Sequence, residues 1–319
     1  MASSDRFVKF AGFNLAWLIG VILFGAWVRI TGSGAGCGSH WPTCNGEIIP
    51  RIERVETIIE FTHRLTSGAC GILGLILIGW AWARFGARHM ATRAAIVTLF
   101  FVIFEGLIGA GIVLKSLVED DSSVARAVVV ALHLVNTLVL TGAASGVVWW
   151  GAGRPSLRFS GARGALKWWL LAALLGIIAV SMTGAITALG DTLFPSALRL
   201  GPQLWTDVRA DMGADQHFLV RLRAVHPVVA MLAALLLILV GDRARFDGAS
   251  PSLRRGAGAM MVIVIAQVLL GIVNIALSAP GWMQLIHLLV AKILWLVTLV
   301  TFALSLTEGQ DPAEPAGEP

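Results

Sequence analysis

Long apolar segments alternate with short polar connections along the whole chain. Each apolar segment runs for about 20 residues, the length that a helix needs to cross a bilayer core of about 30 Å. Only helices satisfy every backbone hydrogen bond within such a segment, so we predict an all-α polytopic membrane protein with eight transmembrane helices. The predicted spans are residues 11–30, 59–83, 94–114, 127–150, 167–189, 223–241, 257–277 and 284–306.

The composition agrees with this pattern. The 319 residues are 57% hydrophobic and 13% charged, and the mean hydropathy is +0.81. A soluble domain of this length with this composition would have too few polar residues to cover its surface. The net charge of +5 comes largely from loop arginines, which flank the spans and form no continuous face. This distribution argues against nucleic-acid binding and indicates a membrane topology signal instead.

Basic residues gather in alternate loops. One side of the predicted membrane receives Arg6, Lys9, Arg84, Arg88, Arg93, Arg154, Arg158, Arg163, Lys167, Arg243, Arg245, Arg254 and Arg255. The other side receives a cysteine-containing loop, an acidic turn at residues 119–121 and the long segment 190–222. The positive-inside bias therefore predicts that both termini are cytoplasmic. The first apolar run lacks a small-residue cleavage site and is predicted to be retained, and the acidic tail 307–319 is predicted to be disordered.

The second half of the chain repeats features of the first. A histidine opens the second, fourth, sixth and eighth predicted spans, at His63, His133, His226 and His287. In addition, residues 105–109 of the third span parallel residues 267–271 of the seventh, with polar and glycine positions in register. We therefore predict two tandem four-helix bundles, residues 1–155 and 156–306. The bundles share one orientation, because four crossings return the chain to its starting side.

The paired histidines indicate a haem site in each bundle. The two even-numbered helices of a bundle run parallel, so their histidines lie at the same depth near the outer side of the membrane. Two imidazoles on facing helices can bind one haem iron from both sides. Packing often explains a lone membrane histidine, but four at repeated positions favour haem. Copper or zinc is a weaker alternative, since no clustered Met or second carboxylate accompanies each pair.

The charged residues near the histidines differ between the bundles. Arginines that could bind haem propionates are Arg29 and Arg64 in the first bundle, and Arg221 and Arg223 in the second. Only the first bundle places a carboxylate, Glu60, three residues before a histidine and so on the same helix face. We predict that the first bundle reacts, with Glu60 moving protons or stabilising charge, whereas the second stores or relays electrons. The alternative is a structural salt bridge between Glu60 and Arg64.

Two cysteines, Cys37 and Cys44, lie in the loop that is predicted outside, where disulfides persist. They are seven residues apart, with Gly38 and Pro42 between them to allow a tight return. This arrangement favours a disulfide over two free thiols. Cys70 lies within an apolar span and is predicted to be a small core residue.

Two further charged residues fall within the predicted spans. Glu105 is predicted to be neutral or paired, because an isolated carboxylate is expensive at membrane depth. Lys292 lies five residues beyond His287, deeper than a surface anchor. A pair with Glu105, a contact with a haem propionate and snorkelling along the helix are its three alternatives.

In these residues the chain resembles the haem A synthase family, which makes haem A from haem O. The resemblance rests on the segment from Gly25 to Gly34 and on the loop with Cys37, Trp41-Pro42 and Cys44. It continues with the motif Glu60-Phe61-Thr62-His63-Arg64, the three later span histidines and the segment Gln267-Val268-Leu269-Leu270-Gly271. It covers essentially all eight predicted helices, from about residue 13 to residue 306, and the combined pattern is specific.

The resemblance implies an activity and roles for these residues. Members of the family oxidise the C8 methyl group of haem O to a formyl group by successive hydroxylations, which end with loss of water. His63 and His133 would match the histidines of the substrate half. His226 and His287 would match the axial ligands of a bound haem b. Glu60 would match the glutamate that turnover requires.

The resemblance also implies a setting and partners. The protein would be a multi-pass protein of the bacterial inner membrane, with haem O as substrate and Cys37 and Cys44 as the extracellular pair. A haem O synthase, an electron-transfer partner and membrane lipid are its expected partners. Glu105 departs from the family pattern, in which a Gln is usual at that position, as at Gln267.

Two other functions are alternatives. The first is a bis-histidine transmembrane electron carrier without chemistry on the macrocycle. It would need haems stacked across both membrane faces, whereas all four histidines lie near one predicted face. The second is a transporter or a structural subunit, which would fit the tandem halves but would offer no reason for the paired histidines.

Overall fold

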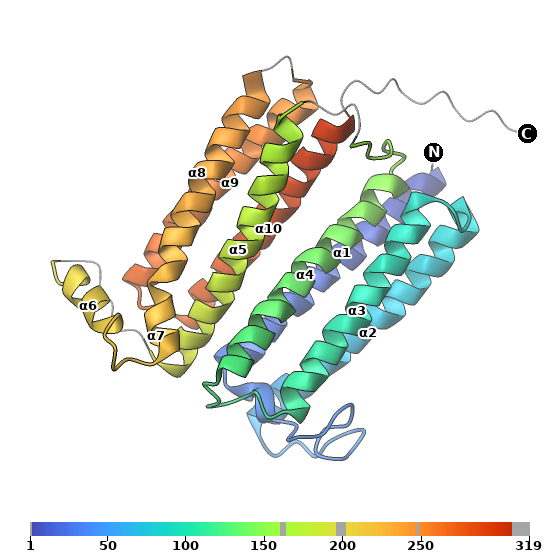
Figure 1. Ribbon diagram of the computed structural model, residues 1–319. Coiled ribbons are helices and arrows are strands. Elements are labelled where there is room, and N and C mark those ends of the chain that lie inside the picture. Colours follow the sequence, from blue (N-terminus) through green and yellow to red (C-terminus); the bar gives the residue numbers. More distant parts are fainter. Residues whose placement is uncertain (1, 160–163, 196–201, 247–248, 308–319) are drawn as a thin grey trace, which may run out of the picture.

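The computed structural model describes residues 2–159, 164–195, 202–246 and 249–307 (Figure 1). Within these ranges the chain is helical and has no β-strand. The helices are α1 (Ala2–Ile30), α2 (Val55–Phe85), α3 (Met90–Leu114), α4 (Val124–Gly151), α5 (Leu166–Leu193), α6 (Leu204–Asp211), α7 (Phe218–Arg223), α8 (Val225–Phe246), α9 (Pro251–Ala276) and α10 (Gly281–Thr307), with a short 3-10 helix, η1 (Ser33–Ala35). The tail that was predicted to be disordered lies, from residue 308 onward, outside the described residues.

Eight helical segments of the described chain are long and apolar enough to cross a membrane. This confirms the prediction of an all-α polytopic membrane protein. The sixth of these segments joins α7 and α8 and covers residues 218–246. Helix α2 begins at Val55 rather than at residue 59, because its first turn carries polar residues such as Glu56 that extend the helix beyond its apolar part.

The long helices lie in two groups, one made of α1, α2, α3 and α4 and the other of α5, α8, α9 and α10 (Figure 1). In the first group α1 and α3 each contact both α2 and α4. In the second group α5 and α9 each contact both α8 and α10. The groups meet mainly where α4 contacts α5 and where α1 contacts α10. These contacts are compatible with two tandem bundles.

Side chains at the helix starts satisfy backbone N–H groups that have no partner within the helix. Ser123 accepts a hydrogen bond from Arg126 N at the start of α4, and Ser250 accepts one from Leu253 N at the start of α9. Imidazole rings cap two further helices. His89 Nδ1 accepts a hydrogen bond from Ala91 N at the start of α3, and His217 Nδ1 accepts one from Leu219 N at the start of α7. Burial lowers the pKa of His89, which keeps this ring a neutral acceptor. Both loop histidines therefore have a structural role in the described chain.

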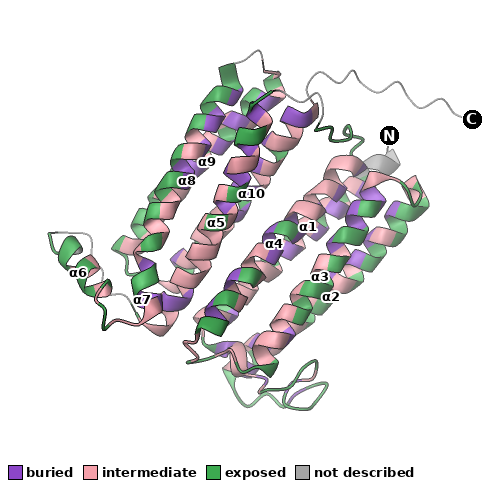
Figure 2. Cartoon of the chain, in the orientation of Figure 1, coloured by how far each residue is buried: buried purple, intermediate pink, exposed green. Residues whose placement is uncertain are grey.

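The outward faces of the long helices are rich in exposed apolar side chains (Figure 2). Ile72, Leu232 and Val262 each leave more than 60% of their surface uncovered, at 63%, 64% and 68%. Exposed apolar surfaces of this kind would promote aggregation in water, but they are suited to contact with the hydrocarbon of a membrane. Buried clusters lie between the helices instead, and one of them joins Leu138 of α4 to Trp295 of α10 across the two groups.

Gly36 allows the loop after η1 to lie directly on the first turn of α2. A Cβ atom at Gly36 would lie 2.3 Å from Glu56 O and 2.7 Å from Thr57 N, and neither backbone atom can move aside by a rotamer change. The Thr57 hydroxyl donates a hydrogen bond to Gly36 O at 2.7 Å, which holds this contact. The outer loop is thus anchored to the helix that carries the Glu60 motif.

Gly36→Ala is therefore expected to destabilise the protein by about 3 kcal/mol, because the overlap can be relieved only by backbone movement. Thermal unfolding of the purified protein in detergent measures this change. Gly20→Ala is the control, since a Cβ at Gly20 would meet nothing within 4 Å and alanine favours a helix. Equal melting temperatures for the two variants would contradict the packing argument.

Candidate functional site

His63 of α2 lies against α1. Its ring packs over Gly25, where a Cβ atom would approach His63 Cε1 to 3.1 Å, and its edge meets the Phe24 ring at a centroid distance of 5.6 Å. The absence of a side chain at Gly25 therefore makes room for the imidazole. His63 Nδ1 is buried and has no hydrogen-bond partner within the described chain.

His133 of α4 belongs to the same helix group. Its Nδ1 lies 3.3 Å from Glu105 Oε1 of α3. The structure therefore places His63 and His133 in one helix group, on α2 and α4.

The second helix group repeats this arrangement with other partners. His226 of α8 packs over Gly184 of α5, where a Cβ atom would approach His226 Cε1 to 3.0 Å. The hydroxyl of Thr183 lies 3.1 Å from His226 Nδ1. Gln267 of α9 lies beside His287 of α10, as Glu105 lies beside His133, but it meets the other ring nitrogen: Gln267 Nε2 is 3.1 Å from His287 Nε2.

His226 and His287 thus both lie in the second helix group, on α8 and α10. The glycines beneath His63 and His226 were missed by the sequence reasoning. The available signal was a Gly-Ala pair, Gly25-Ala26 in the first span and Gly184-Ala185 in the fifth.

The histidine pair of the second group fits a haem iron. Thr183 engages Nδ1 of His226, which leaves Nε2 of that ring as a possible ligand atom. Nδ1 of His287 is buried and unpartnered within the described chain. Two imidazoles suffice as axial ligands, whereas the described residues contain no group of three His, Cys, Asp or Glu side chains that could hold a bare metal ion.

Glu60 is the centre of a clamp between α2 and the outer loop. Only 4% of this residue is exposed, and its Oε2 accepts a hydrogen bond from Cys37 N at 2.7 Å. Its Oε1 accepts from Arg64 Nε at 3.1 Å and from Arg64 Nη2. Arg64 Nη1 in turn donates to the carbonyl oxygens of His40 and Thr43, each at 2.7 Å. The salt bridge that was the structural alternative for Glu60 is therefore present.

The loop held by this clamp contains the predicted disulfide, which is confirmed between Cys37 and Cys44. Both cysteines are buried. Cys70 is a buried free thiol that packs near Leu18 and Leu140, as expected of a small core residue. Within the described chain no hydrogen bond or ion pair joins Glu60 to His63, although the helix spacing places them on one side of α2.

A family model described as COX15-CtaA, cytochrome oxidase assembly protein, matches residues 9–299. The chain belongs to this family. A protein of Thermus thermophilus named Protoheme IX farnesyltransferase is 43% identical over 310 residues, which cover 97% of this chain and 50% of that protein. The chain therefore spans about half the length of that relative.

Shorter matches lead to proteins with another name. Heme A synthase of Alkalihalophilus pseudofirmus is 46% identical over 93 residues, which cover 29% of this chain and 31% of that protein. Heme A synthase of Bacillus mycoides is 43% identical over 110 residues, which cover 34% of this chain and 35% of that protein. The family match covers residues 9–299, whereas these two matches cover 29% and 34% of the chain.

In this COX15-CtaA chain Arg29 connects the two helix groups. From the end of α1 its Nη1 donates to Ala188 O at 2.6 Å and to the Thr192 hydroxyl at 2.5 Å, both on α5. Its Nη2 donates to Gln284 Oε1 of α10 at 2.9 Å. Arg29 was predicted to bind the substrate haem in the first half, yet these donors are directed at the second half.

Arg223 is also engaged by protein groups at the outer end. It forms ion pairs with Asp191 at 2.8 Å and Asp211 at 3.4 Å, and it donates a hydrogen bond to Phe194 O at 2.5 Å. Burial raises the pKa of Asp211, and the Arg223 guanidinium opposes this shift. Arg221, by contrast, is exposed.

Lys292 lies between the two groups with only 1% of its surface exposed. Its ammonium donates a hydrogen bond to the Thr137 hydroxyl of α4. A fully covered ammonium does not snorkel to the membrane surface. Within the described chain no hydrogen bond or ion pair joins Lys292 to Glu105, so the direct partner of the ammonium is the Thr137 hydroxyl.

Proposed function

We propose that this chain is a haem A synthase, which oxidises the C8 methyl group of haem O to a formyl group by successive hydroxylations that end with loss of water. Membership of the COX15-CtaA family supports this function. The observation that carries it is the recurrence of an imidazole pair in each helix group, with different polar neighbours: Glu105 beside His133, but Gln267 beside His287.

The two halves would then bind different haems. Residues 1–155 would bind haem O beside His63 and His133, and residues 156–306 would hold haem b through His226 and His287. A haem with two imidazole ligands accepts and passes on single electrons. Thr183 would orient the His226 ring, and Gln267 would orient His287.

Glu60 would serve the reaction from the edge of the substrate half. Its carboxylate is buried in the outer clamp, where it could accept a proton or stabilise positive charge that develops on the substrate. Arg64 would keep this carboxylate in place, and its own hydrogen bonds to the loop would hold the loop over α2.

The setting of the reaction is part of this proposal. The protein would lie in a bacterial inner membrane with both termini in the cytoplasm, as the distribution of loop arginines predicts. A haem farnesyltransferase would be its partner, because the Thermus relative named for that activity contains a region similar to 97% of this chain. A separate electron-transfer protein would complete the pathway.

Haem extraction after co-expression with a source of haem O tests the function. Haem A or its hydroxylated intermediate is the expected product. A purified protein that holds haem but leaves haem O unchanged would instead support the bis-histidine electron carrier. Absence of any bound haem would contradict both functions.

Histidine substitutions test the division between the halves. His226→Ala and His287→Ala are expected to lose the low-spin haem b spectrum, because each removes an axial ligand. His63→Ala and His133→Ala are expected to keep that spectrum and to form no haem A. His40→Ala is the matched control, because only the main-chain oxygen of this loop histidine takes part in the clamp. Loss of the haem b spectrum in His63→Ala would contradict the assignment.

A further inference from the structure

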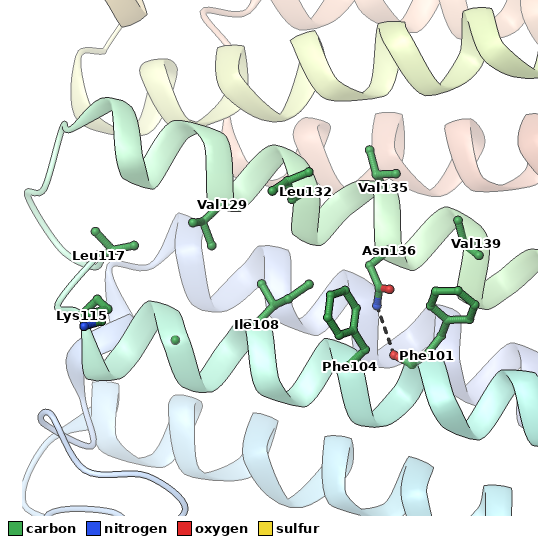
Figure 3. Close-up of a pocket in the computed structure, with 11 residues that line it drawn as sticks. Phe101, Phe104, Ile108, Lys115, Leu117, Val129, Leu132, Val135, Asn136 and Val139 are labelled. Atoms are coloured by element: carbon green, nitrogen blue, oxygen red, sulfur yellow. Dashed lines mark hydrogen bonds between the residues drawn. The ribbon is translucent and has the colours of Figure 1, made fainter.

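A groove lies between α3 and α4 of the first helix group (Figure 3). It encloses a volume of about 490 Å³, which falls in the range of small-molecule sites. Its walls are formed by Phe101, Phe104 and Ile108 of α3 and by Val129, Leu132 and Val139 of α4. Apart from Lys115 at the outer end and Asn136 deeper in the membrane, the lining is apolar.

The groove opens toward lipid. Phe104, Leu132 and Val139 leave 45%, 51% and 37% of their surfaces uncovered. Gly111 of α3 is part of the lining. It has no side chain, and a Cβ atom there would meet nothing within 4 Å, so this part of the groove is open. From Phe101 to Lys115 the lining follows α3 for about 21 Å at 1.5 Å per residue, so the groove can receive an extended chain.

One side chain joins this groove to the proposed substrate site. Asn136 lines the groove, and its amide donates to Phe101 O at 3.1 Å (Figure 3). The same amide also donates to Glu105 Oε2. The other oxygen of Glu105 lies 3.3 Å from His133 Nδ1. The groove wall and the histidine are therefore separated by a single carboxylate.

The second half lacks this polar connection. Asn136 stands three residues after His133, and the corresponding residue after His287 is Val290. Gln267 stands in place of Glu105 and contacts His287 through both the ring and the main-chain oxygen. The hydrogen bond between an asparagine of the groove and a carboxylate beside the histidine is thus found in the half that is proposed to bind substrate.

We infer that the α3–α4 groove binds the isoprenoid chain of a farnesylated haem, and so selects prenylated over unprenylated haem. This inference rests on the proposed function. A farnesyl group is the addition that gives the Thermus relative its name, and it is a branched hydrocarbon that needs apolar walls and no hydrogen bonds. The groove supplies such walls directly beside the site where the porphyrin would lie.

Filling the groove tests the inference. The measurement is absorbance titration of the protein, with haem b already bound in its second half, by haem O and separately by unprenylated protohaem. Gly111→Leu is expected to weaken haem O binding by roughly tenfold or more and to leave protohaem binding unchanged. Gly106→Leu is the matched control, because it lies on the same helix, also meets nothing within 4 Å and is not part of the lining.

A second pair of variants guards against a folding defect in Gly111→Leu. Leu132→Phe narrows the groove from α4, and Leu107→Phe changes an equally exposed side chain of α3 outside it. Only Leu132→Phe is expected to reduce the preference for haem O. Haem A formation with the same preference in all four variants would overturn the groove assignment alone, and would leave a membrane lipid as its occupant. Absence of any haem binding by the first half would overturn both this inference and the proposed function.

Discussion

Replacing Glu60 by alanine is expected to lower haem A formation by roughly 100-fold or more, because a group that transfers a proton or stabilises charge contributes at least this much. The same change removes the acceptor for Cys37 N and the counter-charge of Arg64. Loss of these buried partners is expected to destabilise the outer loop by about 3 kcal/mol. Haem extraction measures the first effect, and limited proteolysis of the loop measures the second.

Glu60→Gln separates the two roles of this side chain. The amide oxygen of glutamine can still accept the hydrogen bond from Cys37 N, so the loop is expected to resist proteolysis almost as well as in the unmodified protein. Haem A formation is nevertheless expected to fall, because the amide cannot take up a proton. Glu56→Gln is the control, since this half-exposed carboxylate lies one turn earlier on α2 and forms an ion pair with exposed Arg54.

The geometry makes this comparison necessary. Both oxygens of Glu60 are engaged by the clamp, and no hydrogen bond or ion pair joins it to His63 within the described chain. Full activity of Glu60→Gln together with an intact loop would show that Glu60 is a structural clamp. Reaction chemistry would then have to be assigned to another group, and Glu105 beside His133 would be the candidate.

The membrane fold could be predicted from the sequence because its main signals are local. A run of apolar residues long enough to cross the bilayer identifies a span wherever it occurs, and eight such runs correspond to the eight long segments of the structure. The histidine pairs were predictable for another reason. Repetition within one chain places His63 and His226, and likewise His133 and His287, at equivalent helix positions.

Contacts between distant parts of the chain were beyond the sequence reasoning. The partners of Arg29 lie 159, 163 and 255 residues away, so no local pattern indicates them. The role of Glu60 was ambiguous for the same reason, because its bond to Cys37 depends on how the outer loop folds over α2. The α3–α4 groove could not be predicted, because its lining comes from two helices and forms only when α4 packs beside α3.

The contacts of Arg29 lead to the second large effect. Arg29→Ala removes hydrogen bonds to Ala188, Thr192 and Gln284, which join α1 to both α5 and α10. Hydrogen bonds to a charged group contribute about 1.5–3 kcal/mol each and are not additive, so we expect a loss of about 4 kcal/mol in the stability of the folded protein. Thermal unfolding in detergent measures this loss, and Arg51→Ala in the exposed outer loop is the control.

Arg29→Lys is expected to recover little of the lost stability. The planar guanidinium reaches acceptors on two helices through separate nitrogens, whereas an ammonium is a single point of donation. A double-mutant cycle of Arg29→Ala with Gln284→Ala measures the part that crosses to α10, and a coupling energy above about 1 kcal/mol is expected. If Arg29→Ala instead leaves the melting temperature unchanged and weakens haem O binding, Arg29 is an anchor for the substrate propionates. In that case the contact between the two halves must depend on the apolar packing around Trp295.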